Sequence, residues 1–130
     1  MSDIETRADI DVLMRAFYDK VLHDPKIGFF FTEVAKLDLN HHLPIIGDFW
    51  ETIILGTGNY ARHGRNPLKV HLGLNTQAHI DPEHFNRWLE IFFQTLDELF
   101  EGRRATLTKQ RAQGIAFRFM GAIAQNGDAP

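Results

Sequence analysis

Apolar residues recur at helical spacing along most of the chain, and no segment alternates between apolar and polar positions with a period of two. This pattern predicts an all-α protein with four substantial helices and one short helix. The first long helix is expected at about residues 6–23, after a capping box formed by Ser2 and Glu5, and Pro25 follows its end. Its apolar face consists of Ile10, Leu13, Met14, Phe17 and Val21.

A second helix is predicted in the middle of the chain, between two irregular segments. Pro44 is tolerated near its start, and Gly56 is the expected C-cap. Residues 27–40 contain a run of three Phe without a long period, which favours short helical turns or a loop with the rings pointing inward. Residues 56–67 are rich in glycine and are predicted to form a loop. The apolar face of the helix consists of Leu43, Ile46, Phe49, Trp50, Ile53 and Ile54.

The strongest helical signal begins after Asp81, a favourable N-cap that is followed by Pro82 at the first helical position. This helix is expected to close at Gly102, and the last helix to begin at Thr106 or Thr108 and to end before the polar tail QNGDAP. Residues 1–130 are expected to form one domain with flexible ends at about 1–6 and 125–130. The apolar stripe of the strongest helix consists of Phe85, Trp88, Leu89, Phe92, Phe93, Leu96, Leu99 and Phe100.

One short helix is predicted over residues 68–72, LKVHL, between Pro67 and Gly73, with a loop over residues 73–80. A helix of about two turns is unstable alone, because isolated helices in water need on the order of 12–15 residues. A strong bond from the imidazole of His71 to a bound group would hold it. Neutral imidazole is the commonest protein metal ligand, and a single axial histidine is one way to hold haem iron. Burial statistics alone favour a structural or surface role for a lone histidine such as His71.

Composition narrows the classes of function. The net charge of −3 and the scattered basic residues argue against nucleic acid as a partner. The absence of cysteine excludes disulfides and thiolate metal sites and is compatible with the cytoplasm, and no apolar run approaches the roughly 18 residues that a membrane span needs. The chain contains 11 Phe and two Trp, a content that suits either dense packing or the lining of a flat apolar ligand.

Three further side chains are candidates for a site. Of the adjacent pair His41 and His42, only one is expected to face the interior, and His42 is favoured because it lies four residues before Ile46; the alternative is a pair of surface histidines. Tyr18 borders the apolar face of the first helix, where a hydroxyl usually reaches water, and Trp88 lies in a stripe that is usually plain core. Neither a phosphate loop nor a catalytic triad stands out, and no convergent zinc or di-iron set is found.

Several segments, in this order and spacing, resemble the group III truncated haemoglobins: AFYDKV at 16–21, HLPIIGDFW at 42–50, NPLKVHL at 66–72, FNRWLEIF at 85–92 and QRAQGIA at 110–116. The resemblance covers nearly the whole chain. It implies a two-over-two helical sandwich around one haem b, with a very short proximal helix and His71 as the proximal iron ligand. On the distal side it implies Tyr18, His42 and Trp88, with His42 as a ligand or gate of the iron. The expected cofactor contacts also include Phe31, Ile46, Phe49 and Leu68.

The resemblance implies reversible binding of O₂, CO and NO. Three donors near the bound ligand would slow O₂ release, which argues for high-affinity binding or for NO or peroxide chemistry rather than transport. Catalysis would need a separate reductase, and the chain is expected to be a monomer. Pro44 predicts an irregular helix start that lets His42 swing. The propionate partners stay open among Arg62, His63, Arg65 and Lys69. Two alternatives are a haem-free helical interaction module and a non-haem metal enzyme.

Overall fold

The computed structural model describes residues 1–64 and 66–127, and the regular elements found there are all helical. Two short turns accompany the five α-helices: a π-helical turn, η1, at Phe30–Val34, and a 3-10 turn, η2, at Asn59–His63. The predicted all-α class is confirmed. The α-helices are α1 (Arg7–Val21), α2 (Leu39–Leu55), α3 (Pro67–Gln77), α4 (Pro82–Leu99) and α5 (Arg103–Gly127).

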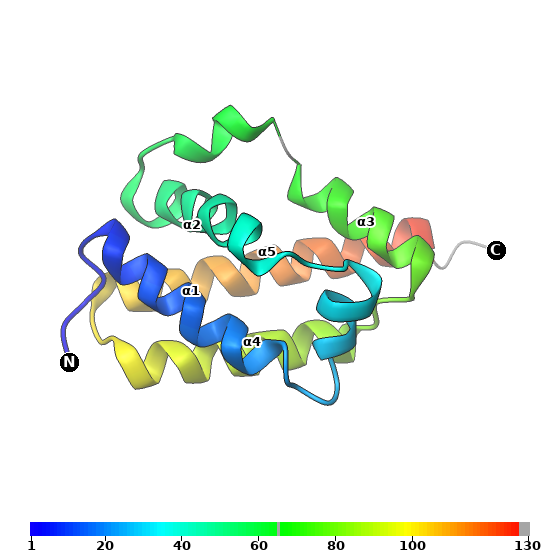
Figure 1. The fold of residues 1–130 in the computed structure, drawn as a ribbon, viewed down its shortest axis with the longest axis horizontal. Helices are drawn as coiled ribbons and strands as arrows, with labels where there is room; N and C mark the ends of the chain where they lie inside the picture. The colour runs from blue at the N-terminus through cyan, green and yellow to red at the C-terminus, as the bar shows by residue number, and fades with distance from the viewer. Residues whose placement is uncertain (65, 128–130) are drawn as a thin grey trace.

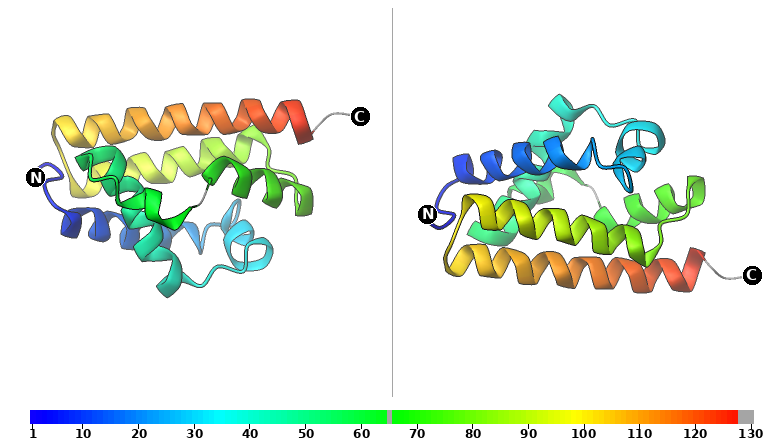
Figure 2. Two further views of the ribbon diagram at one scale, coloured as in Figure 1. Left: turned by 90° about the horizontal axis from the view of Figure 1, so that it is seen from above. Right: turned by 90° about the horizontal axis from the view of Figure 1, so that it is seen from below.

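The four long helices form two packed pairs. Helices α4 and α5 lie side by side in opposite directions, and α1 packs on both α4 and α2 (Figures 1 and 2). This arrangement is the expected two-over-two sandwich. Helix α3 packs on α5 at one end of the sandwich, and η2 packs on α2.

Aromatic rings fill the centre of the sandwich. Phe17 of α1 meets the rings of Trp88 and Phe92 of α4 edge-on, with centroid distances of 5.6 and 5.0 Å. Trp50 of α2 stacks on Phe92 at 5.1 Å. Such edge-to-face and offset pairs add stability beyond the area that they bury. The high phenylalanine content therefore serves dense packing between the two layers.

Helix α1 begins with a different cap from the one predicted. The capping box consists of Thr6 and Asp9: the Thr6 hydroxyl accepts the Asp9 N–H, and the Asp9 carboxylate accepts the Thr6 N–H at 3.1 Å. Ser2, predicted for this role, instead accepts the Glu101 N–H through its carbonyl at 3.0 Å. The Ser2–Glu5 box was wrong because the first residues are engaged elsewhere in the fold.

We call residues 2–4 the N-terminal strap, and it caps α5. The two carboxylate oxygens of Asp3 accept the backbone N–H groups of Arg104 and Ala105, each at 2.9 Å, and Ile4 is fully buried. The predicted start at Thr106 or Thr108 was therefore wrong, since α5 begins at Arg103 with a cap from the other end of the chain. Residues 2–4, which belong to the end expected to be flexible, thus pack on the rest of the domain.

The other end of the chain also extends further than predicted. Helix α5 continues into the polar tail as far as Gly127. Residues 128–130 of the expected flexible end lie outside the described residues.

Helix α3 is longer than predicted. The side chain of Asn66 caps it by accepting the N–H groups of Leu68 and Lys69, and the helix continues through Gly73 to Gln77. The predicted end of the helix at residue 72 and the predicted loop over 73–80 were both wrong. Gly73 resembles a stop signal, but a glycine inside a helix costs only about 1 kcal/mol and does not end it. No residue of α3 is fully buried, although Leu68, Leu72 and Leu74 pack against the core while partly exposed.

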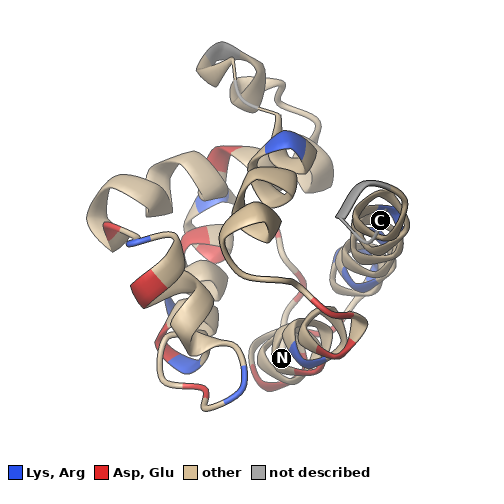
Figure 3. Cartoon of the chain, turned by 90° about the vertical axis from the view of Figure 1, so that its right-hand side faces the viewer, with Lys and Arg blue, Asp and Glu red and all other residues tan. Residues whose placement is uncertain are grey.

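Charged residues of both signs are interspersed over the face of the molecule that Figure 3 presents. Within the described part of the chain, no helix is both long and apolar enough to cross a membrane.

Candidate functional site

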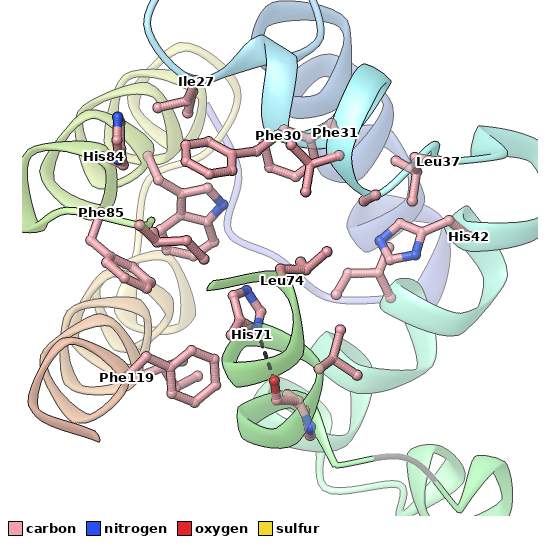
Figure 4. A pocket seen from close by; sticks show the side chains of 18 of the residues that line it. Ile27, Phe30, Phe31, Leu37, His42, His71, Leu74, His84, Phe85 and Phe119 are labelled. Atoms are coloured by element: carbon pink, nitrogen blue, oxygen red, sulfur yellow. Dashed lines mark hydrogen bonds between the residues drawn. The ribbon is translucent and has the colours of Figure 1, made fainter. Parts of the chain in front are cut away.

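A cavity of about 400 Å³ opens between α2, α3, α4 and η1. Its wall is mostly apolar and aromatic, as Figure 4 shows, and ligand sites in proteins commonly have volumes of roughly 300–1,000 Å³. Seven of the eight predicted site residues line it, and Leu68 lies in a neighbouring cavity instead. Those seven are Tyr18, Phe31, His42, Ile46, Phe49, His71 and Trp88.

His71 projects from α3 into this cavity (Figure 4). Its Nδ1 lies 2.7 Å from the Pro67 carbonyl oxygen. Because a carbonyl only accepts, Nδ1 carries the proton, and in the neutral ring Nε2 keeps its lone pair. Burial lowers the pKa of His71 and outweighs the Pro67 carbonyl, which acts in the opposite direction. The arrangement presents a neutral imidazole, the form that coordinates metals.

The rings of Phe119 and Phe85 flank the imidazole of His71 at centroid distances of 4.7 and 6.3 Å. Phe85 lay in the predicted apolar stripe of α4, but nothing in the sequence pointed to the contact of either ring with His71. They restrict the ring to one side of the cavity.

A hydrogen bond joins two predicted distal residues across α1 and α2. The Tyr18 hydroxyl lies 2.9 Å from Nε2 of His42, and the two rings meet edge-on at 5.4 Å. Tyr18 is buried and lines the cavity, which favours its prediction as a site residue over the alternative of a border tyrosine with its hydroxyl in water. His42 is half-buried and His41 is exposed, which confirms the choice between the two histidines.

Pro44 does not interrupt the helix that carries His42. Helix α2 runs continuously from Leu39 through Pro44, so the irregular start that was predicted is not found. Proline has no N–H, however, and the Asn40 carbonyl therefore lacks its usual partner four residues ahead. The first turn, which holds His42, has one helical bond fewer than a regular turn.

Trp88 lines the cavity as well as the core. Its indole stacks on Phe92 with an interplanar angle of 13°, and the residue is half-buried. The stacking fixes the ring plane. Trp88 therefore has both of the roles that the sequence left open, as core and as cavity wall.

The η1 turn forms the wall opposite α3. The Ala35 N–H bonds to the Phe30 carbonyl at 2.8 Å, five residues back, and Lys36 has a φ of 50° just after the turn. Such π-turns are rare and often occur at functional sites. Phe31 meets Tyr18 edge-on at 5.9 Å. The turn thereby places consecutive phenylalanines against the cavity.

An ion pair between a buried carboxylate and a partly exposed guanidinium anchors the segment before η1. Asp24 accepts the side chain of Arg87 on α4 at 2.7 and 2.9 Å and the N–H groups of Lys26 and Ile27 at 3.0 and 3.1 Å. Burial would raise the pKa of Asp24, but these hydrogen bonds outweigh it and lower the pKa. No sequence signal pointed to this pair, because its partners lie 63 residues apart.

His84, in the first turn of α4, is a cavity residue that no sequence signal pointed to. Its Nδ1 accepts the Asp81 N–H at 2.9 Å, and its ring contacts Phe30 at 4.7 Å.

Of the four residues considered as propionate partners, His63 bonds to Asp48 at 2.7 Å, and Lys69 is exposed. Arg65 and the side chain of Arg62 lie outside the described residues. Across the described part of the chain, no three His, Asp or Glu side chains gather into a group that could hold a metal ion.

The two-over-two helical sandwich, with a histidine facing an aromatic cavity, defines a globin of the truncated class. No family model matches the chain. The chain is 32% identical over 118 residues to a group 3 truncated hemoglobin of Campylobacter jejuni, covering 88% of each sequence. The crystal structure of group III truncated hemoglobin from the same organism matches with a TM-score of 0.80, 32% identity and 94% coverage of each chain. This chain belongs to the group III truncated haemoglobins.

Proposed function

We propose that the chain binds one haem b in this cavity, with His71 as the proximal ligand, and reversibly binds O₂, CO and NO. One observation carries the proposal: the Nδ1–H of His71 donates to the Pro67 carbonyl, which leaves Nε2 free to coordinate. A ligating histidine commonly donates its other N–H to a carbonyl in this way. The aromatic wall suits a flat apolar macrocycle, and Phe31, Ile46 and Phe49 would contact it.

When bound, haem supplies an iron centre that takes up diatomic ligands. The distal side chains then determine how firmly a ligand is held. Tyr18 and Trp88 carry O–H and N–H donors, and His42 adds a third when its tautomer presents Nε2–H. In the chain alone, the Tyr18 hydroxyl is engaged with His42. Donation from the Tyr18 hydroxyl to a bound ligand would require this hydrogen bond to break.

We infer high-affinity ligand binding or redox chemistry on NO or peroxide rather than O₂ transport, because three donors in a buried wall slow ligand release. In such chemistry His42 holds or delivers a proton at Nε2. A separate reductase supplies the electrons. We further propose a monomer acting in the cytoplasm, a location with which the absence of cysteine is compatible.

Absorption spectra of the purified, haem-supplied protein in the ferric, ferrous and CO forms test the proposal. We expect a Soret band that shifts on reduction and on addition of CO. His71→Ala should lose tight haem binding or the proximal bond, whereas His41→Ala, at an exposed position on α2, should leave the spectra unchanged.

A colourless protein that ignores added haem would refute the haem proposal and favour a helical interaction module. Zinc in place of iron on metal analysis would favour a non-haem metal enzyme. An unaltered spectrum in His71→Ala would refute the assignment of the proximal ligand.

A further inference from the structure

Two buried carboxylates on α2 lie outside the cavity that His71 faces. Asp48 and Glu51 are 3% and 8% exposed, and both accept hydrogen bonds from Nη1 of Arg7 at the start of α1. Nη2 of Arg7 also donates to the Pro44 carbonyl at 3.2 Å. Buried charges are costly unless they are paired. The guanidinium therefore ties α1 to α2 at this point.

The same carboxylates hold the η2 turn. Nε2 of His63 donates to Asp48 at 2.7 Å, and the side-chain amide of Asn59 donates to Glu51 at 2.8 Å. The Tyr60 N–H donates to the Thr52 hydroxyl of α2 at 3.1 Å. Three hydrogen bonds thus attach the η2 turn to α2.

The packing around Arg7 leaves no room for a side chain at Gly47. A Cβ added there would lie 2.6 Å from Nη2 of Arg7. Burial alone would lower the pKa of Arg7, but its hydrogen bonds to Asp48 and Asp11 raise it, so the group stays cationic. The close approach and the permanent charge make this a specific ionic network.

We propose that the network of Arg7, Asp48, Glu51, Asn59 and His63 positions the proximal helix α3 and thereby sets the direction of His71. Helix α3 starts at Pro67, shortly after His63, and none of its residues is fully buried, although it packs on α5. Its orientation therefore depends in part on how the segment before it is held.

Tyr60 extends the effect of the network to the cavity itself. Tyr60 lines the cavity, and its ring contacts those of Phe49 and His63 at 5.1 and 5.9 Å. Arg7, Asp48 and Glu51 do not line the cavity, and their hydrogen-bonded route toward α3 passes through η2. The inference rests on the proposed haem site, since the direction of His71 matters for the bond to iron.

Asp48→Asn tests the network, because it removes one charge and keeps the shape of the side chain. In the ferrous, haem-loaded protein we expect the iron–histidine stretching band to shift or broaden and haem to dissociate about 10-fold faster. Asp11→Asn is the matched control: Asp11 also bonds to Arg7, at 2.9 Å, but is exposed on α1 and does not reach η2. It should change neither readout.

A second variant, His63→Ala, leaves the Arg7–Asp48 pair intact and releases only η2. We expect the same changes in smaller measure. Backbone amide exchange in Asn59–His63 and Pro67–Gln77, measured without haem, should also quicken in both variants. If Asp48→Asn does not fold, His63→Ala decides the question.

An unchanged stretching band and dissociation rate in both variants, beside a wild type that binds haem through His71, would overturn the positioning role alone. A wild type that binds no haem would instead refute the proposed function. In that case amide exchange in the haem-free variants tests the positioning of α3. Faster exchange in the two segments than in the wild type supports the positioning, and unchanged exchange overturns it.

Discussion

Removing Arg87 should expose how much the cavity wall depends on one ion pair. Its guanidinium makes two hydrogen bonds to the buried carboxylate of Asp24, just before the segment that carries η1. Arg87→Ala leaves that carboxylate with only the N–H groups of Lys26 and Ile27. Hydrogen bonds to charged groups contribute about 1.5–3 kcal/mol, and Arg87 is partly exposed, so we expect a loss of about 2 kcal/mol.

For a chain of this size, that loss corresponds to a fall in Tm of roughly 6–10 °C, measurable by circular dichroism. The loss of stability in Arg87→Ala should depend on pH. Because the fold lowers the pKa of Asp24, the ion pair stabilises the protein fully at pH values above the ordinary pKa of 3.8. This stabilisation is lost as the pH falls through the lowered pKa of Asp24 in the folded chain. The deficit should therefore shrink toward pH 3.

Glu90→Ala is the control, because it removes only the exposed second partner of Arg87 and should change stability by less than about 0.5 kcal/mol. A fall in Tm of under about 2 °C for Arg87→Ala would refute the argument. So would a deficit that is as large at pH 3 as at pH 7.

Three further predictions concern other parts of the molecule. Burial lowers the pKa of His71 below 6.5 in the folded chain, so the unfolded chain takes up the proton at higher pH than the folded chain does. The stability of the haem-free chain should therefore fall as pH drops below 6.5. In thermal melts at a series of pH values, His71→Gln should make this fall of stability with pH less steep. Gly102 has a φ of 147°, and a Cβ there would lie 2.5 Å from the Asp3 carboxyl carbon, so Gly102→Ala should lower the free energy of unfolding by about 1–3 kcal/mol. A Cβ at Gly114 would meet nothing within 4 Å, so Gly114→Ala should raise the free energy of unfolding by up to about 1 kcal/mol. Equal melting temperatures for the two variants would contradict this. Tyr18→Phe should speed O₂ dissociation about 10-fold in stopped-flow measurements, and an unchanged rate would exclude its hydroxyl as a donor to the ligand.

The elements that the sequence predicted well are those whose signals are local. Gly56 ends α2 with a φ of 73°, and Pro82 opens α4, where the pattern placed them. The choice of His42 over His41 followed from helical geometry alone. Propensity, capping residues and a 3.6-residue period suffice where an element's ends are determined within a few residues of sequence.

What the sequence missed is held by partners far along the chain. The start of α5 depends on Asp3, and the segment before η1 depends on the pairing of Asp24 with Arg87. The extent of α3 was missed for a different reason, since Gly73 resembled a stop signal but lies inside the helix. Periodicity contains no information about which distant side chain will satisfy a helix end or a buried charge.

The same distinction applies to the site. Resemblance to a family placed His71 at the cavity, but the bond from its Nδ1 to Pro67 is visible only in three dimensions. Leu68 lines the neighbouring cavity, because residues on one helix can face two different cavities, and its contact with a cofactor stays a prediction. The contacts of Phe85 and Phe119 with His71 likewise arise only when α3, α4 and α5 come together.

The N-terminal strap imposes an order on how this domain is completed during synthesis. Asp3 precedes its partners Arg104 and Ala105 by 101 and 102 residues, so it is synthesised well before them. Contacts of such long sequence separation form late, because the intervening chain must first be ordered. The cap of α5 and the burial of Ile4 therefore form only after the start of α5 has been made, and in a nascent chain that stalls before this point residues 2–4 have no partner to pack on.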